Sequence, residues 1–274
     1  MTHTIPTYSL NDGLEVPVVG FGTDKLKGAK GLLAIRQALT NGYRFLDTAY
    51  AYENEATVGK AVRERGLNRN EVLISSKLPE SYHQYDLAIP AIQESLYRAG
   101  LDYYDLYLIH WPDPKQDKFV EAWQALIDAQ KFGLVRSIGV SNFHPDQLQR
   151  LKDETGIVPS INQIQTHPYY IQDKLIEGNK KHDVLTQSWS PLGNRMADDL
   201  LDNETIRSIG ESYNKSIGQV ILRWQVQSGF MPIPRSSSPV RQKDNLTLFD
   251  FELTETEMHT INTLAKPDGD IYGG

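Results

Sequence analysis

Short apolar runs alternate along the chain with longer segments whose apolar residues recur every three or four positions. The runs have the length of β-strands, and the longer segments have the period of amphipathic helices. The first unit joins the run 18–21 to a helical segment with Leu32, Ile35 and Leu39 on one face. Eight such units follow one another, and their apolar runs span residues 18–21, 44–47, 72–77, 106–110, 137–141, 161–163, 184–189 and 230–235.

Helix boundary signals support this alternation. Glycine, which adopts the left-handed conformation at helix ends without steric cost, follows predicted helices at positions 42, 66, 100 and 133. The third helix is expected to open at Asp86, and Thr254 and Glu257 have the spacing of a capping box that opens the last helix. The connection between the seventh and eighth runs is enlarged, because it holds two helical segments, 203–213 and 216–227.

A hairpin is predicted before the first unit. The apolar stretches 4–10 and 14–18 flank Asn11, Asp12 and Gly13, and asparagine and glycine supply the positive φ of a tight turn. Eight strand–helix units without a break in composition predict an α/β fold, a (β/α)8 TIM barrel that forms a single domain over residues 1–274. The hairpin is then expected to plug the amino end of the barrel, with extra helices in the enlarged connection.

Composition narrows the class of protein. The chain of 274 residues has no cysteine, which excludes disulfides and thiolate metal sites, and no histidine pair has the spacing of a zinc motif. The formal net charge of -7 argues against nucleic acid or an anionic membrane as a partner. Because residues 1–10 lack a signal-peptide pattern and no apolar run approaches ~20 residues, we expect a cytoplasmic protein.

Polar residues at the ends of the predicted strands point to a site. In a barrel of this kind the carboxyl ends of all strands meet at one face. Because neighbouring strands lie ~4.8 Å apart, we expect Asp47, Lys77 and His110 to lie within side-chain reach of one another. The residues at or just past the strand ends are Thr23, Asp47 with Tyr52, Lys77, His110, Ser141 with Asn142, Gln163, Trp189, and Arg235 with Ser236.

This combination of groups suggests carbonyl chemistry. A nearby ammonium stabilises a phenolate and makes a tyrosine a better proton donor at neutral pH. In this hypothesis Lys77 supplies the charge and Asp47 holds Lys77. His110 hydrogen-bonds the substrate oxygen, and Tyr52 protonates that oxygen once hydride has reached the carbonyl carbon. Taken alone, Asp47 and Tyr52 also suit a structural interpretation, in which the aspartate caps a turn and the tyrosine packs.

Hydride transfer requires a cofactor, and a nicotinamide is the expected one. No Rossmann fingerprint is present, since no third glycine follows the Gly-Phe-Gly sequence at 20–22 with the required spacing. Ser141, Asn142 and Gln163 instead offer hydrogen bonds to a carboxamide, and the Trp189 indole offers a surface on which the nicotinamide ring can stack.

A segment rich in cationic and hydroxyl groups follows the eighth run. Guanidinium groups bind phosphate through paired hydrogen bonds, and barrel enzymes often bind phosphate after their last strands. A 2′-phosphate bound here favours NADPH over NADH. The structural alternative is a solvated helix start in which three serines compete to cap the helix. The residues expected to bind the cofactor are Arg235, Ser236, Ser237, Arg241, Asp244 and Asn245.

Taken together, the motifs resemble the aldo-keto reductase family over nearly the whole chain. The likeness rests on Asp47-Thr48-Ala49 with Tyr52, Asn54 and Glu55, on His110-Trp111-Pro112, on 138–143, on Asn162-Gln163 before His167-Pro168, and on 233–236 with Arg241 and Asn245. It implies a catalytic tetrad of Asp47, Tyr52, Lys77 and His110 and an NADPH bound in extended form. Further cofactor contacts are expected from Gly22, Thr23, Asp47, Ser190 and Leu192.

The segment around Trp189 resembles the bacterial 2,5-diketo-D-gluconate reductase branch of this family, which implies that residues 190–203 fold as a lid over the pyrophosphate. Arg235 and Asp244 stand where lysine and glutamate are usual, which leaves the strength of the NADPH preference open. Gln165 replaces a common glutamate, with no consequence that the sequence reveals. The chain ends without a long tail, and this implies an open site for small aldehydes and ketones.

Two functions are compatible with the sequence. The first is NADPH-dependent reduction of a small carbonyl substrate to an alcohol, with diketogluconate, methylglyoxal, a β-keto ester and a simple aldehyde all open. The second is a nucleotide-binding, redox-sensing partner subunit with little turnover. Trp111, Tyr50 and Phe21 follow strand ends and either line the substrate site, where Trp111 is expected beside Tyr52 and His110, or pack the barrel mouth. We expect a monomer that holds no metal.

Overall fold

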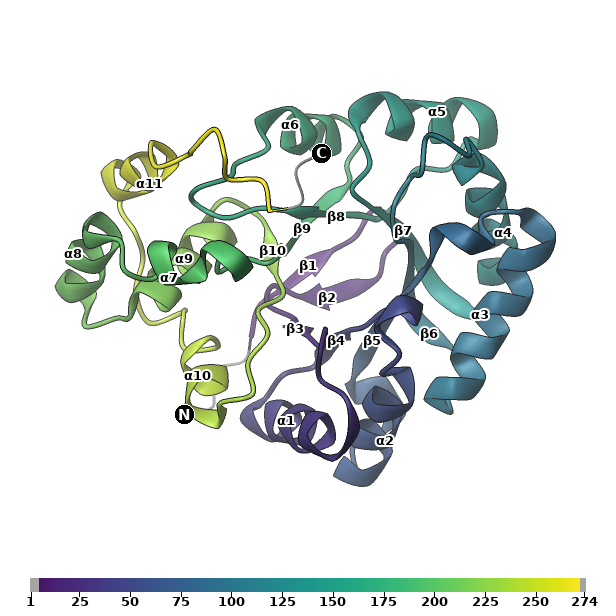
Figure 1. Ribbon diagram of the computed structural model, residues 1–274, viewed down its shortest axis with the longest axis horizontal. Coiled ribbons are helices and arrows are strands. Elements are labelled where there is room, and N and C mark those ends of the chain that lie inside the picture. Colours follow the sequence, from purple (N-terminus) through teal and green to yellow (C-terminus); the bar gives the residue numbers. More distant parts are fainter. Residues whose placement is uncertain (1–4, 272–274) are drawn as a thin grey trace.

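Eight parallel strands form one sheet in the computed structural model, which describes residues 5–271. Each strand pairs with its neighbours in sequence, and helices surround the sheet (Figure 1). The strands are β3 (Phe21–Gly22), β4 (Phe45–Asp47), β5 (Leu73–Leu78), β6 (Tyr104–Ile109), β7 (Val135–Ser141), β8 (Ile161–Gln165), β9 (Leu185–Trp189) and β10 (Met231–Pro232).

Two backbone hydrogen bonds join the first strand of this sheet to the last. The amides of Gly20 and Gly22 donate to the carbonyls of Pro232 and Pro234 at 3.0 and 3.2 Å. These bonds connect the two edges of the sheet, which is consistent with the predicted (β/α)8 barrel. The last strand is shorter than the predicted run 230–235, because a proline has no N–H and can only accept hydrogen bonds in the ladder.

Most of the long helices match the segments predicted from apolar periodicity, and α8 and α9 occupy the enlarged connection between β9 and β10. The long helices are α1 (Gly28–Asn41), α2 (Glu55–Arg65), α3 (Tyr85–Ala99), α4 (Phe119–Lys131), α5 (Pro145–Thr155), α6 (Asp173–Lys181), α8 (Glu204–Tyr213), α9 (Ile217–Gln227) and α11 (Glu255–Asn262). The short ones are α7 (Ala197–Leu200), α10 (Pro239–Asp244) and the 3-10 turns η1 (Tyr50–Tyr52), η2 (Arg69–Glu71), η3 (Glu80–Tyr82) and η4 (Asn194–Met196).

The helix boundaries confirm most of the predicted signals. Gly42, Gly66 and Gly100 follow α1, α2 and α3 with φ of 111, 73 and 64°, the left-handed conformation that ends a helix. The capping box of α11 is present, since Thr254 Oγ1 accepts from the Glu257 amide at 3.3 Å and Glu257 Oε2 accepts from the Thr254 amide at 2.7 Å.

The predicted start of α3 at Asp86 was wrong. The helix begins at Tyr85, and its capping position is Gln84. Asp86 lies in the first turn, where a negative charge stabilises the helix dipole without capping the helix.

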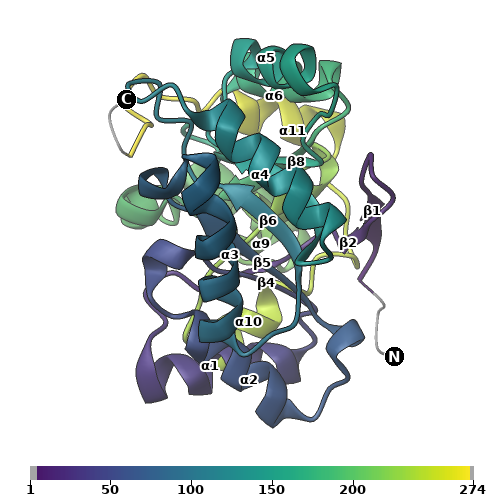
Figure 2. The same cartoon turned by 90° about the vertical axis from the view of Figure 1, so that its right-hand side faces the viewer.

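The predicted hairpin is present at the amino ends of the strands. Strand β1 (Thr7–Ser9) pairs antiparallel with β2 (Glu15–Pro17). Asn11 in the turn donates to the carbonyls of Pro159 and Asp183, each 2.9 Å away and each just before β8 or β9. Figure 2 shows the hairpin on one side of the molecule and the C-terminal segment on the other. Thr4, in the predicted stretch 4–10, and residues 272–274 lie outside the described residues.

An apolar cluster fills the interior of the sheet at the amino ends of the strands. The cluster at its amino end contains Leu10 and Val16 of the hairpin and five strand residues, Phe45, Leu106, Leu108, Ile161 and Met231. Within residues 5–271, none of the helices combines the length and the apolar character needed to cross a membrane.

Candidate active site

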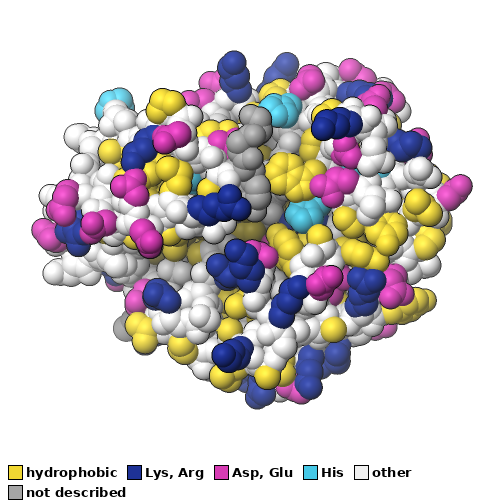
Figure 3. Space-filling view, in the orientation of Figure 1, with side chains coloured by type: hydrophobic (Ala, Val, Ile, Leu, Met, Phe, Trp, Pro, Cys, Tyr) yellow, Lys and Arg dark blue, Asp and Glu magenta, His cyan; other side chains and the backbone are white. Residues whose placement is uncertain are grey.

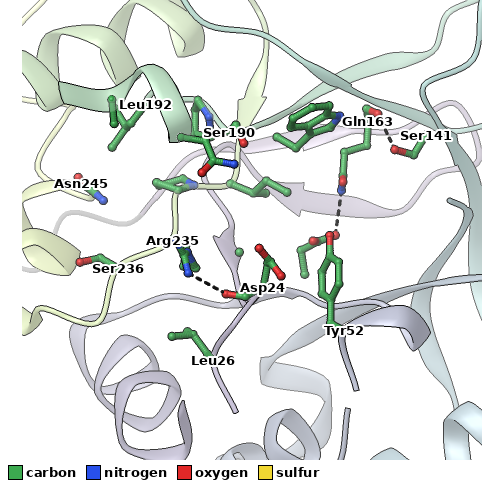
Figure 4. A pocket seen from close by; sticks show the side chains of 18 of the residues that line it. Asp24, Leu26, Tyr52, Ser141, Gln163, Ser190, Leu192, Arg235, Ser236 and Asn245 are labelled. Carbon is green, nitrogen blue, oxygen red and sulfur yellow. Dashed lines mark hydrogen bonds between the residues drawn. The ribbon is translucent and has the colours of Figure 1, made fainter. Parts of the chain in front are cut away.

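A cavity of about 590 Å³ opens at the carboxyl ends of the strands. The molecule is hollowed there (Figure 3), and side chains from several strands surround the hollow (Figure 4). Of the predicted site residues, Thr23, Lys77 and Asp244 do not line the cavity. The predicted residues that do line it are Gly22, Asp47, Tyr52, His110, Trp111, Ser141, Asn142, Gln163, Trp189, Ser190, Leu192, Arg235, Ser236, Ser237, Arg241 and Asn245.

Lys77 and Asp47 form a buried ion pair at the base of the cavity. The Lys77 ammonium donates to both Asp47 oxygens at 2.8 and 2.7 Å and to the Thr48 carbonyl at 2.8 Å. Asp47 Oδ1 also accepts from Ser75 Oγ at 2.9 Å and from Gln163 Nε2 at 2.8 Å. The ammonium is thus fixed in one position, as the pairing of the ends of β4 and β5 predicts.

Tyr52 lies at the end of η1, above this ion pair. The centre of its ring is 5.0 Å from the Lys77 ammonium and 5.7 Å from the centre of the His110 ring, which it meets edge to face at 78°. The neighbouring Asn54 holds the turn, since its side chain accepts from Thr48 Oγ1 at 2.6 Å and donates to the Thr23 carbonyl at 2.7 Å. The tyrosine, lysine and histidine that the sequence groups together are therefore neighbours.

Burial sets the ionisation of two groups in this cluster. It lowers the pKa of Lys77, and the Asp47 carboxylate acts in the opposite direction. Burial, with a smaller contribution from the Lys77 charge, also lowers the pKa of His110 to about 3. The His110 imidazole is therefore neutral at neutral pH, and it offers one N–H donor and one acceptor nitrogen.

A chain of hydrogen bonds orders the wall formed by β7, β8 and β9. The Trp189 indole donates to Asn142 Oδ1 at 2.9 Å, and Asn142 Nδ2 donates to Ser141 Oγ at 2.9 Å and to the His110 carbonyl at 3.2 Å. Ser141 Oγ donates in turn to the Gln163 carbonyl at 2.7 Å. Asn142 has a φ of 63°, which asparagine tolerates better than most residues. The indole is therefore held in one orientation against the cavity.

The cationic charge of the cavity wall comes from Arg235 and Arg241. Arg235 Nη1 donates to the Asp24 carbonyl at 3.2 Å and so spans from the end of β10 to the end of β3 (Figure 4). Asn245, just past α10, lines the same part of the cavity, whereas Asp244 lies outside the lining. The predicted phosphate segment thus contributes two guanidinium groups to the cavity.

The model of one protein family, described as the aldo/keto reductase family, matches residues 19–266. The chain belongs to the aldo/keto reductase family. It is 44% identical over 270 residues to 2,5-diketo-D-gluconic acid reductase B of Corynebacterium sp. (strain SHS752001), with 98% of this chain and 96% of that protein covered. It is 42% identical over 274 residues to methylglyoxal reductase DkgA of Yersinia pestis, with 98% of each chain covered.

A solved structure extends the likeness to the fold. The crystal structure of an aldo-keto reductase of Bombyx mori in complex with NADP matches with a TM-score of 0.89 and 36% identity, and the match covers 96% of this chain and 94% of that one. These comparisons confirm the predicted family and its predicted likeness to 2,5-diketo-D-gluconate reductases. As a family member with reductases as relatives, the protein is an oxidoreductase.

A second cavity of about 470 Å³ adjoins the first in this aldo/keto reductase, and the two share Trp111 and Asn142. Its wall carries two carboxylates, Glu80 and Asp113, and no lysine or arginine among the residues that the structure describes. The arginine side chains of the combined site therefore lie in the first cavity, and the second places two carboxylates beside His144. Over residues 5–271, no cluster of three or more potential metal-binding side chains is present.

Several lining residues of the aldo/keto reductase site escaped prediction from sequence. They come from the loop after β3, from the predicted lid 190–203 and from the start of the motif 233–236, just past β10. Asp24 directly follows the predicted Thr23, so the sequence could have indicated it. The lining residues that were not predicted individually are Asp24, Leu26, Pro191, Asn194, Ala197, Leu201, Ile233 and Pro234.

The structure gives different positions to the three aromatic residues whose roles the sequence left open. Trp111 lines both cavities. Phe21 is fully buried, and its ring centre lies 5.0 Å from that of Tyr43. The Tyr50 ring lies 5.3 Å from the Tyr82 ring at a tilt of 56°. Neither Phe21 nor Tyr50 lines a cavity.

Gln165 has a consequence that the sequence did not reveal. Its Nε2 donates to the Gly269 carbonyl at 2.9 Å, and its Oε1 accepts from the Ile271 amide at 3.3 Å. The C-terminal segment is thereby attached to the carboxyl end of β8. A glutamate carboxylate at this position could accept but not donate, so the amide suits both contacts.

Proposed function

We propose that this protein reduces small aldehydes and ketones to alcohols with NADPH as the hydride donor. The observation that carries the proposal is the Lys77 ammonium, 5.0 Å from the centre of the Tyr52 ring beside a cavity that holds cationic residues elsewhere in its wall. A positive charge beside a phenol favours phenolate over phenol, and this is why the proposal assigns the proton transfer to Tyr52. The reductases among the relatives support the same type of reaction.

Each residue of the tetrad has a separate part in the proposal. Tyr52 donates its proton to the carbonyl oxygen as negative charge develops there. The neutral His110 donates a hydrogen bond to the same oxygen and so orients the substrate. Lys77 keeps a positive charge beside Tyr52, and Asp47 keeps Lys77 in place through two hydrogen bonds.

The residues present fit an extended nicotinamide cofactor, which when bound supplies the hydride. The Trp189 indole offers a flat aromatic wall, fixed by its bond to Asn142. Ser141, Asn142 and Gln163 offer hydroxyl and amide groups for the carboxamide, and Ser190 and Leu192 extend the wall toward the pyrophosphate. The Bombyx mori relative was solved with NADP, which supports the same class of cofactor here.

The preference for NADPH over NADH rests on two guanidinium groups. Arg235 and Arg241 line the cavity together with Ser236 and Asn245, and guanidinium binds a phosphate monoester through two parallel hydrogen bonds. Arg241 is exposed before binding, so it can turn to a 2′-phosphate without first breaking a buried contact. NADH lacks this phosphate and is expected to bind more weakly.

Three further features belong to the proposal. Residues 190–203 act as a lid over the cofactor, since Ser190, Leu192 and Leu201 line the cavity. The hairpin plugs the amino end of the barrel, since Leu10 and Val16 pack on the side chains inside the sheet. The 274 residues form one domain that works as a monomer on a small carbonyl substrate.

The test is the consumption of NADPH, followed by its absorbance, with a panel of aldehydes, dicarbonyls and keto acids. Wild type is expected to turn over, whereas Tyr52→Phe keeps the ring and lacks the proton, so its kcat should fall about 100-fold or more. Binding of NADPH should survive this substitution. Equal rates for the two proteins would exclude Tyr52 as the proton donor.

The same assay addresses the second hypothesis from the sequence, a redox-sensing partner subunit. That hypothesis expects both proteins to bind NADPH and neither to turn over any substrate. The relatives named as reductases give it no support.

A further inference from the structure

Glu55 is a buried carboxyl group that the proposed chemistry does not use. It is the first residue of α2, and only 2% of its surface is exposed. Its Oε1 accepts hydrogen bonds from Ser76 Oγ at 2.6 Å, from Ser95 Oγ at 2.5 Å and from the Tyr104 hydroxyl at 3.1 Å. These donors belong to β5, α3 and β6, so one oxygen joins three elements around the site.

The bond to Ser76 connects the segments that carry two residues of the tetrad. Ser76 precedes Lys77 in β5, and successive residues of a strand point to opposite faces. Lys77 therefore reaches Asp47 on one face while Ser76 reaches Glu55 on the other. Glu55 lies three residues after Tyr52, the last residue of the turn η1. One hydrogen bond thus ties the segment that follows the proposed proton donor to the strand of the ammonium.

Ser95 provides a comparison within the same cluster. It donates to the same Glu55 oxygen at a similar distance, but from α3, which carries no member of the tetrad. Loss of either hydroxyl removes the same kind of bond from the same buried group. Of the two serines, only Ser76 lies on a strand that carries a residue of the proposed chemistry.

The surroundings of Glu55 favour its neutral form. Its Oε2 and the Tyr107 hydroxyl are both buried, and neither has a hydrogen-bond partner within the described part of the chain. The cation that acts on it is Arg98 of α3, which is 39% exposed and pairs with Glu94. Burial raises the pKa of Glu55, and the three hydrogen bonds to its Oε1 act more weakly in the opposite direction. A protonated carboxyl removes a charge that the facing tyrosines of β6, Tyr104 and Tyr107, cannot neutralise.

We propose that Glu55 is a positioning residue for the reduction: by clamping the start of α2 to β5 through Ser76, it sets the position of Tyr52 relative to Lys77. The inference rests on the proposed function, because it requires Tyr52 as proton donor and Lys77 as the neighbouring charge. Neither Glu55 nor Ser76 lines the cavity. Loosening the clamp is therefore expected to slow the chemical step and to leave the binding of substrate and cofactor unchanged.

Ser76→Ala and Ser95→Ala form a matched pair for the test. Each removes one hydrogen bond to Glu55, and Ser95→Ala also removes the contact of Ser95 Oγ with the Tyr104 hydroxyl at 3.0 Å, so its thermal midpoint should fall at least as far as that of Ser76→Ala. Only Ser76→Ala should lower kcat, about five- to tenfold, with unchanged KM for NADPH and for the aldehyde. An equal kcat in the two variants, or an effect on KM alone, would overturn the positioning role and leave Glu55 as a packing group.

Substitutions of Glu55 itself distinguish the effect of its hydrogen bonds from the effect of its charge. Glutamine is neutral and keeps an acceptor oxygen for Ser76, so the kcat of Glu55→Gln should stay within about twofold of wild type at neutral pH. Glu55→Ala should lose at least as much kcat as Ser76→Ala. Full kcat in Glu55→Ala overturns the inference, and if that variant does not fold, the serine pair decides.

A second buried carboxyl serves as the control for general destabilisation. Asp105 lies near the amino end of β6, where it accepts from the Ile74 amide and pairs with Arg69 and Arg136. Asp105→Asn should lower the thermal midpoint and leave kcat unchanged. Wild type is measured first. If wild type shows no turnover, the proposed function and the positioning role are both overturned. If wild type is active and Ser76→Ala has the same kcat, the positioning role alone is overturned.

Discussion

The Lys77 ammonium lies 5.0 Å from the centre of the Tyr52 ring, although the two side chains come from successive strand–helix units. The register of β4 and β5 fixes the lysine, and the short turn η1 fixes the tyrosine. Lys77→Met is therefore expected to keep the fold of the site and to remove its charge. Without the ammonium, protonation of the substrate oxygen by Tyr52 should slow about 100-fold or more in kcat.

The stability of the Lys77 variant must be measured beside its kcat. Loss of the ammonium leaves the Asp47 carboxylate buried without a cation, which costs about 3–5 kcal/mol of the free energy of unfolding. Adding Asp47→Asn should recover most of this free energy and none of the activity. Recovery of kcat in the double variant would show that charge on Lys77 is unnecessary.

His110 is expected to stay neutral over the working range of pH. Its pKa of about 3 lies below the ordinary value of 6.5, so kcat/KM should show no histidine ionisation between about pH 5 and 8. The unfolded chain takes up this proton first, so the free energy of unfolding should decrease as the pH falls from 6.5 toward 3. His110→Gln should reduce the slope of this decrease, and His83 and His167, whose pKa burial lowers to about 4, account for part of the remaining slope. A titration near pH 6.5 that disappears in His110→Gln would contradict the neutral donor.

Glu55 is expected to give the opposite slope of stability against pH. Burial raises its pKa above the ordinary value of 4.5, so the folded protein holds this proton over a range in which the unfolded chain has lost it. The free energy of unfolding should therefore decrease as the pH rises above 4.5 toward the raised pKa. The difference in this free energy between Glu55→Gln and wild type, measured by urea unfolding, should move in favour of the variant as the pH rises. A difference independent of pH would show that folding does not raise the pKa of Glu55.

Arg241 is expected to carry part of the preference for NADPH. Arg241→Ala removes one guanidinium from the cavity wall, and because a hydrogen bond to a charged group contributes about 1.5–3 kcal/mol, the Kd for NADPH should rise about tenfold or more. The Kd for NADH should not change. Lys243→Ala is the matched control, since Lys243 is a basic residue of the same helix that does not line the cavity. An equal effect of the two substitutions would reduce the role of Arg241 to general electrostatic attraction.

The second cavity is expected to select against anionic substrates. Glu80 and Asp113 place negative charge beside Trp111, and two unit charges about 4 Å apart in water interact by about 1 kcal/mol. Neutral aldehydes should therefore have a higher kcat/KM than keto acids of the same length. The double variant Glu80→Gln with Asp113→Asn should raise kcat/KM for the keto acid several-fold and leave kcat/KM for the neutral aldehyde unchanged. Glu121 of α4 lies outside both cavities, so Glu121→Gln should change neither value of kcat/KM.

The fold and the proximity of the four predicted site residues could be predicted because they depend on short-range patterns. Apolar periodicity located the strands, and glycines located the helix ends. Asp47 ends β4, Lys77 is the second-to-last residue of β5 and His110 directly follows β6, and parallel pairing brings such positions together. The direction of the Thr23 side chain could not be read in this way. Its hydroxyl turns inward and donates to the Asp47 carbonyl at 2.8 Å, so it holds β4 in place and does not line the cavity.

The loop residues of the cavity could not be predicted for a different reason. Between β9 and α7 the backbone takes left-handed conformations at Ser190, Gly193 and Asn194, with φ of 50, 86 and 46°. Serine rarely adopts this conformation, and contacts with the rest of the protein decide when it does. The orientation of the whole segment follows from these turns, so no local pattern reveals which of its side chains face the cavity.

The joint between β3 and β10 differs from the other strand pairings in the sheet. Pro232 and Pro234 can only accept there, and Gly22 leaves so little room that a side chain on it would meet the Ile233 carbonyl at 2.8 Å. Hydrogen bonds therefore run in one direction across this joint, from glycine to proline. Transient opening of the sheet should therefore occur at this joint first. The Gly20 and Gly22 amides should exchange with deuterium before the amides of β5 and β6.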